Sequence, residues 1–183
     1  YSAAQRKAEL QVMLLQAIDE MKTACVTPEM LEAAAEDCGD GLGDKLGDLA
    51  LISAAYDAVV AQGHADPMDR LSILAGQIPD AAFGPDTYVY VDGFIDFTAQ
   101  ERAVLSALLR KGVQLTVCMT VDELQGNNEI YALSRIAARR LLAEAKEMGL
   151  EVIIEHMEGD GKDEALRFFA DNLFSYSAAR YGG

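Results

Sequence analysis

Two strand-like runs joined by one helix, in the second half of the chain, constrain the fold most strongly. Thr87–Val91 is a short run of β-branched and aromatic residues, typical of a strand buried on both faces. A capping box of Thr98 and Glu101 opens the helix, and Gly112 ends it. Val113–Val121 is the next strand-like run. Because a right-handed crossover returns the chain beside the first strand, this order predicts a parallel pair.

The same alternation continues toward the C-terminus. A helix is expected from Glu129 to Met148, with Gly149 as its stop, and Leu150–His156 reads as a third strand. A last helix is expected over Asp163–Phe174. The order β-α-β-α-β-α predicts a mainly parallel α/β sheet with flanking helices.

The first part of the chain reads as helical. Apolar residues from Leu10 to Met21 recur at helical spacing, and Thr27-Pro28 and Asp66-Pro67 are helix starts. The glycine-rich Gly39–Gly47 lacks the ending of a phosphate loop and the glutamate of a calcium loop, so we expect a helix–helix linker. We therefore expect a helical subdomain over residues 1–84 and an α/β domain over residues 85–183.

The formal net charge is −15. Residues 1–86 carry 15 acidic and 5 basic side chains, and residues 87–183 carry 15 and 10. Such a surface repels phosphate, so the isolated chain should bind nucleic acid weakly. Three widely spaced cysteines and two histidines predict neither a zinc site nor disulfides, as in a cytoplasmic protein. We expect no membrane span, and the absence of an initiator Met indicates a piece of a longer protein.

The end of the first strand-like run carries the candidate chemistry. In P-loop ATPases a strand-end aspartate holds Mg²⁺ and its neighbour positions the attacking water. Here Asp92 is followed by Gly93, with Asp96 four residues beyond Asp92 and Asp122 after the second run. One interpretation is an ordinary loop aspartate, and the other is a relic of a motor.

The residues around Asp92 match a longer pattern. Val91-Asp-Gly-Phe94, Phe97-Thr98 and Gln100-Glu101 resemble the V-D-G-F-x-x-F-T-x-Q-E stretch of the AddB-type subunit of bacterial ATP-dependent helicase/deoxyribonucleases. The similarity extends over about residues 43–175. It includes Lys45–Ile52, Asp69–Ala75, Leu115–Asp122 and Leu173-Phe174.

This resemblance implies a fragment of the subunit's N-terminal, superfamily 1 helicase-like region, with a P-loop-like sheet and an inserted helical subdomain. Asp92, Gly93 and Asp96 would form a degenerate D-E-x-x-D motif that does not hydrolyse ATP. The implied role is a scaffold in a DNA-end-processing complex for double-strand break repair and recombination. Its implied partners are the motor/nuclease subunit of the same complex and single-stranded or duplex-end DNA. ATP, Mg²⁺ and an iron–sulfur cluster are implied elsewhere in the parent, and no cofactor is expected in this fragment.

Four further residues are candidates for contacts with DNA, while none is assigned to catalysis or to a metal. Phe94 and Phe97 would either stack on an unpaired base or pack under the following helix. Arg135 and Arg139 would either touch a phosphate backbone or the partner subunit, or form a solvated helix face. Two alternative functions stay open: a Mg²⁺-dependent phosphatase-like α/β enzyme, and a protein-interaction domain unrelated to DNA.

Overall fold

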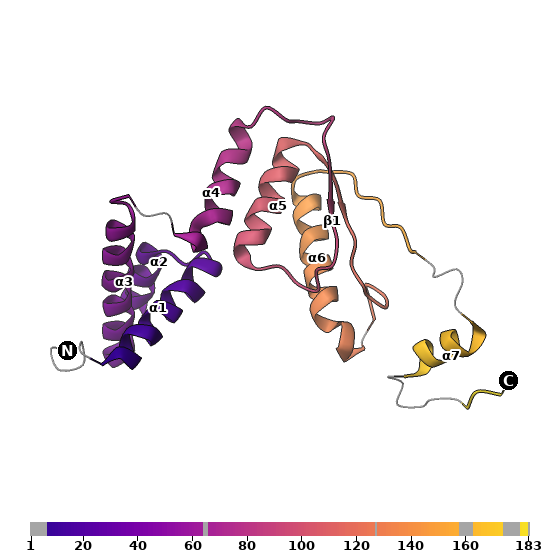
Figure 1. Ribbon diagram of the computed structural model, residues 1–183, viewed down its shortest axis with the longest axis horizontal. Coiled ribbons are helices and arrows are strands. Elements are labelled where there is room, and N and C mark those ends of the chain that lie inside the picture. Colours follow the sequence, from indigo (N-terminus) through magenta and orange to yellow (C-terminus); the bar gives the residue numbers. More distant parts are fainter. Residues whose placement is uncertain (1–6, 64–65, 127, 158–162, 174–179, 183) are drawn as a thin grey trace. The chain divides into compact units, whose positions relative to one another are not determined.

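The computed structural model describes residues 7–63, 66–126, 128–157, 163–173 and 180–182 (Figure 1). The chain divides into two units, residues 1–150 and 151–183, each considered by itself below. In the described ranges, the chain consists mainly of helices together with one small parallel sheet, which confirms the α/β class in its coarse form. None of the described helices is both long and apolar enough to cross a membrane.

The N-terminal part of the first unit is helical, as expected. Thr27 accepts a hydrogen bond from Met30 N at the start of the second helix, and Asp66 accepts one from Met68 N before Pro67. Both caps confirm the start signals in the sequence. The elements are α1 (Ala8–Thr23), α2 (Pro28–Asp37), α3 (Asp40–Val60), η1 (Pro67–Asp69), α4 (Arg70–Gln77) and η2 (Ile78–Asp80).

The expected linker over Gly39–Gly47 is wrong, because helix α3 begins at Asp40. Glycine normally weakens a helix. At Gly43 the close approach of the backbone at the end of α2 explains why a glycine is needed. A Cβ atom at this position would lie 2.5 Å from Cys38 O and 2.8 Å from Ala35 O. Tertiary packing thus overrides the local preference of a glycine-rich sequence.

A buried ammonium group links the N-terminal helices to one another. Lys22 Nζ of α1 lies 3.1 Å from Asp57 Oδ1 of α3, 3.0 Å from Asp66 Oδ2 and 2.7 Å from Asp69 Oδ1. Tyr56 places its ring 5.3 Å from the ammonium and donates its hydroxyl to Asp66 Oδ2. These five residues, which we call the Lys22 cluster, connect α1, α3 and η1.

The Lys22 cluster shifts the pKa values of its members. Burial lowers the pKa of Lys22, but the hydrogen bonds to the three carboxylates raise it by more, so its pKa lies above the ordinary value. Burial raises the pKa of Asp66, yet hydrogen bonds from Met68 N, Lys22 and Tyr56 hold it below the ordinary value. The charged forms are therefore favoured in the folded protein.

The sheet consists of β1 (Tyr88–Val91) and β2 (Gln114–Val117), joined by α5 (Ala99–Lys111). The strands are parallel and pair Tyr88 with Gln114 and Val91 with Val117, as predicted from the crossover. The second strand ends four residues earlier than expected, so Asp122 lies in the following loop. The expectation of a strand buried on both faces is also wrong, because Tyr88 and Tyr90 are exposed.

Helix α5 lies at the centre of the hydrophobic core. Its capping box, Thr98 with Glu101, and its stop at Gly112 are as predicted. Ser106 Oγ donates to the Glu144 carboxylate of α6 (Ala132–Glu147), which follows η3 (Glu129–Tyr131) and lies beside α5 in Figure 1. The buried residues of the core cluster around α5 are Ile78, Phe97, Leu105, Ala107, Leu108, Val113 and Ala137.

The second unit contains α7 (Glu164–Asn172), which nearly matches the helix expected over Asp163–Phe174. Phe174 itself lies outside the described residues. The third strand expected over Leu150–His156 is wrong, because this segment is neither helix nor strand. A strand forms only when a partner satisfies its backbone groups, and here Ile153 is 77% exposed. An apolar run is therefore insufficient evidence of a strand.

Gly43 and Gly47 provide a matched test of helix packing within α3. We expect Gly43→Ala to lower the free energy of unfolding, because the new methyl group would meet the carbonyl oxygens of α2. Gly47→Ala should raise it by about 0.5–1 kcal/mol, since no atom lies within 4 Å of the added methyl group and alanine is the better helix former. Urea denaturation of both variants measures the difference. Equal stabilisation by both would contradict the close approach of α2.

Removing the ammonium of Lys22 should leave the carboxylates around it unpaired. We expect Lys22→Met to lower the free energy of unfolding by about 3 kcal/mol at pH 7, near the lower end for a broken buried ion pair because Asp57 and Asp69 are partly exposed. The exposed Lys45→Met is the control, with an expected effect within about 0.5 kcal/mol.

The pH dependence follows from the lowered pKa of Asp66. Its stabilising contribution is present above its unfolded pKa of about 3.9 and is lost as the pH falls through the lower folded pKa. We therefore expect the difference between the parent chain and Lys22→Met to shrink below about pH 4. Melting temperatures at pH 7 and at acidic pH test this, and a constant difference would argue against the cluster.

Candidate functional site

The turn that follows β1 is held by its own carboxylates. Asp92 Oδ1 accepts a hydrogen bond from Gly93 N at 2.8 Å, and Asp96 Oδ1 accepts one from Phe97 N at 2.7 Å. Both carboxylates are on exposed residues, and each orders the backbone at one end of the turn. We call residues 92–97 the strand-end turn.

Gly93 has a backbone conformation that other residues adopt only with strain. Its φ is +81°, in the left-handed region, and open space surrounds the position of a Cβ atom. The requirement for glycine is therefore conformational and does not come from crowding. A side chain here would cost about 1–2 kcal/mol of backbone strain.

The two phenylalanines of the turn have different environments. Phe97 is 5% exposed and belongs to the core, whereas Phe94 is 37% exposed. Their rings stack with centroids 5.0 Å apart and planes inclined by 24°. In this conformation Phe97 supports the turn from the core side, and Phe94 is the ring of the pair that reaches solvent. The predicted DNA contacts of both residues stay predictions.

The two candidate arginines of α6 hold the loop after β2. Arg135 Nη1 donates to Asp122 Oδ1 at 2.7 Å, and Arg135 Nη2 donates to Asn128 O at 2.6 Å. Arg139 Nε donates to Leu124 O at 2.6 Å. Arg135 is buried and Arg139 is exposed. The sequence predicted a basic stripe at this position, but the structure gives both side chains a local partner.

The pairing with Arg135 changes the protonation of Asp122. Desolvation raises the pKa of the Asp122 carboxyl. The hydrogen bonds from Arg135 and from the backbone of Glu123 lower this pKa by more, so the net pKa lies below the ordinary value. Asp122 is thus an ionised partner of a guanidinium.

The site offers hydrogen-bonded carboxylates and exposed apolar groups. Among the described residues, no group of three or more His, Cys, Asp and Glu side chains is arranged to hold a metal ion. The turn and the loop after β2 both leave the carboxyl edge of the sheet, where ligands of parallel sheets commonly bind.

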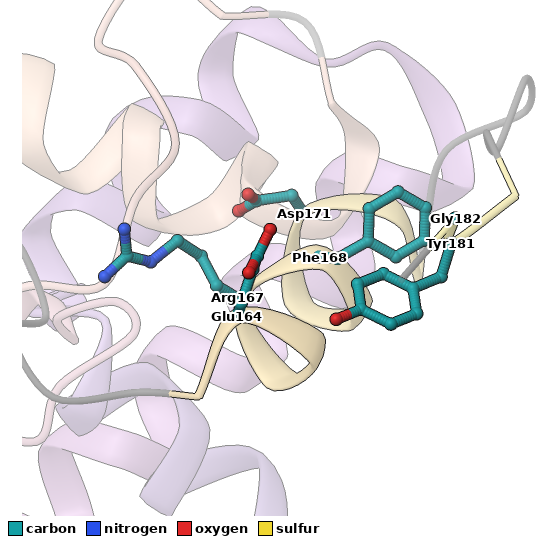
Figure 2. Close-up of a pocket in the computed structure, with 6 residues that line it drawn as sticks. All are labelled: Glu164, Arg167, Phe168, Asp171, Tyr181 and Gly182. Atoms are coloured by element: carbon teal, nitrogen blue, oxygen red, sulfur yellow. The ribbon is translucent and has the colours of Figure 1, made fainter.

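The second unit has its own open hollow, of about 450 Å³. Glu164, Arg167, Phe168, Asp171, Tyr181 and Gly182 line it. In Figure 2 the rings of Phe168 and Tyr181 face each other, with centroids 5.3 Å apart, and Arg167 extends away from them. The hollow lies beside a single short helix and has none of the residues singled out in the sequence.

Sequence reasoning missed a buried residue that connects helix α5 to η1 and α4. Gln100 is 4% exposed, and its Nε2 donates to Met68 O at 2.6 Å and to Ser72 Oγ at 3.1 Å. The sequence analysis had named Gln100 only as one residue of the family motif. Its partners, 32 and 28 residues away, carry no signal in the sequence that could have revealed them.

Comparison with known proteins gives a consistent result. Residues 1–173 match the family described as ADDB, N-terminal. Three relatives are each described as the B-type subunit of an ATP-dependent helicase/deoxyribonuclease. That of Desulforudis audaxviator is 34% identical over 143 residues, covering 74% of this chain and 12% of the relative. That of Moorella thermoacetica is 40% identical over 115 residues, covering 60% and 10%.

The relative from Thermoanaerobacter sp. (strain X514) is 29% identical over 186 residues, covering 96% of this chain and 16% of the relative. The chain therefore spans only 10–16% of the length of these three relatives.

The two stacked rings should contribute unequally to stability. We expect Phe97→Ala to lower the free energy of unfolding by about 3–5 kcal/mol, because it removes a buried core residue. Phe94→Ala should cost about 1 kcal/mol, since its ring is partly exposed and stacks on one neighbour. Guanidinium denaturation measures both. Losses of equal size would show that the two rings share one environment.

Proposed function

The chain belongs to the ADDB N-terminal family, and we propose that it is a non-hydrolysing, helicase-like scaffold within the B-type subunit of a DNA-end-processing helicase/deoxyribonuclease. The observation that carries the proposal is Gly93, which follows the strand-end Asp92 with a φ of +81°. In an active helicase with the D-E-x-x-D motif, a catalytic glutamate directly follows the strand-end aspartate. Here the backbone itself disfavours any side chain.

The strand-end turn supports the same proposal. Asp92 and Asp96 hold backbone N–H groups, which gives each carboxylate a structural task. The other residues of the motif have structural contacts too. Phe97 packs in the core, Thr98 and Glu101 form the capping box of α5, and Gln100 contacts η1 and α4. The residues of the motif therefore position the strand-end turn and helix α5.

The charge of the segment that carries β1 and the strand-end turn argues for a scaffold more than for a phosphate site. Residues 71–101 include five acidic side chains and no Lys, Arg or His. Phosphate binding relies on such cations. Of the four candidate DNA contacts, Phe94 and Arg139 are exposed and Phe97 and Arg135 are buried. We propose that any DNA contact in the assembled complex involves Phe94 or Arg139.

The remainder of the proposal comes from the family. We propose that the sheet is the second half of a P-loop-like motor domain, interrupted by the helical residues 1–84. We also propose a partner motor/nuclease subunit in the bacterial cytoplasm, and ATP, Mg²⁺ and an iron–sulfur cluster at sites elsewhere in the complex. Double-strand break repair and recombination are the processes that such a complex would serve.

ATP hydrolysis tests the proposal. We expect Asp92→Asn in the assembled complex to change DNA-stimulated ATP turnover by less than about twofold, because Asp92 holds only the turn. The isolated chain should not hydrolyse ATP. As a control, replacement of the motor subunit's own catalytic residue should abolish turnover. A loss of about tenfold or more in Asp92→Asn, with the complex still assembled, would refute the scaffold role.

A further inference from the structure

We infer that the hollow between α1 and the start of α5 is a conformational device, which closes when Arg102 of α5 forms an ion pair with Asp19 and Glu20 of α1. In the structure this hollow is open, with a volume of about 480 Å³. We call it the α1–α5 hollow, and its lining includes Asp19, Glu20, Ala24, Thr98, Ala99 and Arg102. All of these residues belong to the first unit, and the inference does not depend on the proposed function.

The two walls of the α1–α5 hollow carry opposite charges. Asp19 and Glu20 belong to α1, and Arg102 belongs to α5. In the described part of the chain, neither a hydrogen bond nor an ion pair joins the guanidinium to either carboxylate. The open hollow therefore keeps groups of opposite charge apart.

The guanidinium of Arg102 has a donor without an acceptor. Its Nε atom is buried and has no hydrogen-bond partner among the described residues. A buried donor left unpaired is unfavourable, and more so on a charged group. Water in the hollow does not relieve this, because the atom is out of contact with solvent. A carboxylate from α1 would supply both the acceptor and the opposite charge.

Two of these charges also have the wrong sign for their own helix. The N-terminal end of a helix carries a partial positive charge, and the C-terminal end a partial negative charge. Arg102 is the fourth residue of α5, and Glu20 lies in the last turn of α1. Each is therefore unfavourable within its own helix, and an ion pair across the hollow would offset both effects.

A dissolved anion suits the α1–α5 hollow less well than the carboxylates of α1 do. A phosphate group would approach the first N–H groups of α5, but the capping box of Thr98 and Glu101 already occupies this end of the helix. Asp19 and Glu20 on the opposite wall would repel the anion. The partner that fits Arg102 best is therefore already part of the chain.

Closure of the hollow would act on the strand-end turn. Thr98 lines the hollow, caps α5 and directly follows Phe97, the last residue of the turn. Gln100 fixes the same end of α5 to η1 and α4. Because this end of α5 is held in place, closure brings α1 toward it. The hollow thus couples the position of α1 to the strand-end turn.

Disulfide formation across the hollow tests the inference. In the 183-residue chain, Cys25, Cys38 and Cys118 are replaced by Ser, and Ala24→Cys and Ala99→Cys place one thiol on each wall. A disulfide needs Cα atoms within about 7 Å, so its rate of formation reports how often the walls meet. With hydroxyethyl disulfide, an uncharged oxidant, we expect this rate to fall about fivefold when 1 M NaCl screens the charges.

Substitutions of the charged residues separate the ion pair from other causes. Arg102→Met should slow disulfide formation about fivefold and remove its dependence on salt. Arg102→Glu combined with the exposed Glu20→Lys should react about fivefold faster than Arg102→Glu alone. The matched control is Arg110→Met, which removes an exposed arginine of the same helix outside the hollow and should leave the rate unchanged.

The other rate patterns overturn the inference. Equal rates in the parent chain and in Arg102→Met, or no disulfide in either, would show that the hollow stays open. An equal loss of rate in Arg110→Met would indicate a general effect of charge. A slower rate in phosphate or oligothymidine than in NaCl at the same ionic strength would assign the hollow to an anion from solution. If Ala24→Cys prevents folding, Thr23→Cys gives the same readout from the α1 wall.

Discussion

The burial of helix α5 is the interaction on which the rest of the first unit depends. Its apolar residues, Leu105 and Leu108 among them, form the centre of the core together with Ile78 and Val113. Its N-terminus fixes the strand-end turn through the capping box, and Gln100 joins it to the helical part. Ser106 joins it to α6. One helix thus positions the sheet, the turn and the N-terminal helices.

Under the proposed function, the strand-end turn would be an active-site frame that keeps its shape without its chemistry. The carboxylates that would serve a metal in a motor here hold backbone groups. The residue after Asp92 is Gly93, whose left-handed backbone conformation a glutamate would adopt only with strain. The hydrogen bonds of the turn come from Asp92 and Asp96, and neither of them involves a side chain at position 93.

Local chemistry explains which parts of the fold could be predicted. The caps at Thr27, Asp66 and Thr98 involve atoms within three residues of each other, so their sequence signals are complete. The helical state of Gly43 was missed because its packing against Ala35 and Cys38 outweighs the low helix propensity of glycine. The segment near Ile153 was misjudged because an apolar run does not show whether a partner strand is present. At the candidate site, the sequence located the turn, but the contacts of Arg135 depend on a loop whose path no short pattern encodes.

The Lys22 cluster has a consequence for the kinetics of the molecule. Its ammonium pairs with Asp69, 47 residues further along the chain, so the contact can close only after α1, α3 and η1 have come together. We expect a contact of such long sequence separation to form after the folding transition state and to act mainly on the barrier to unfolding. We therefore expect the Lys22 cluster to slow the unfolding of the N-terminal helices. The rate at which these helices fold should depend mainly on the local contacts within them.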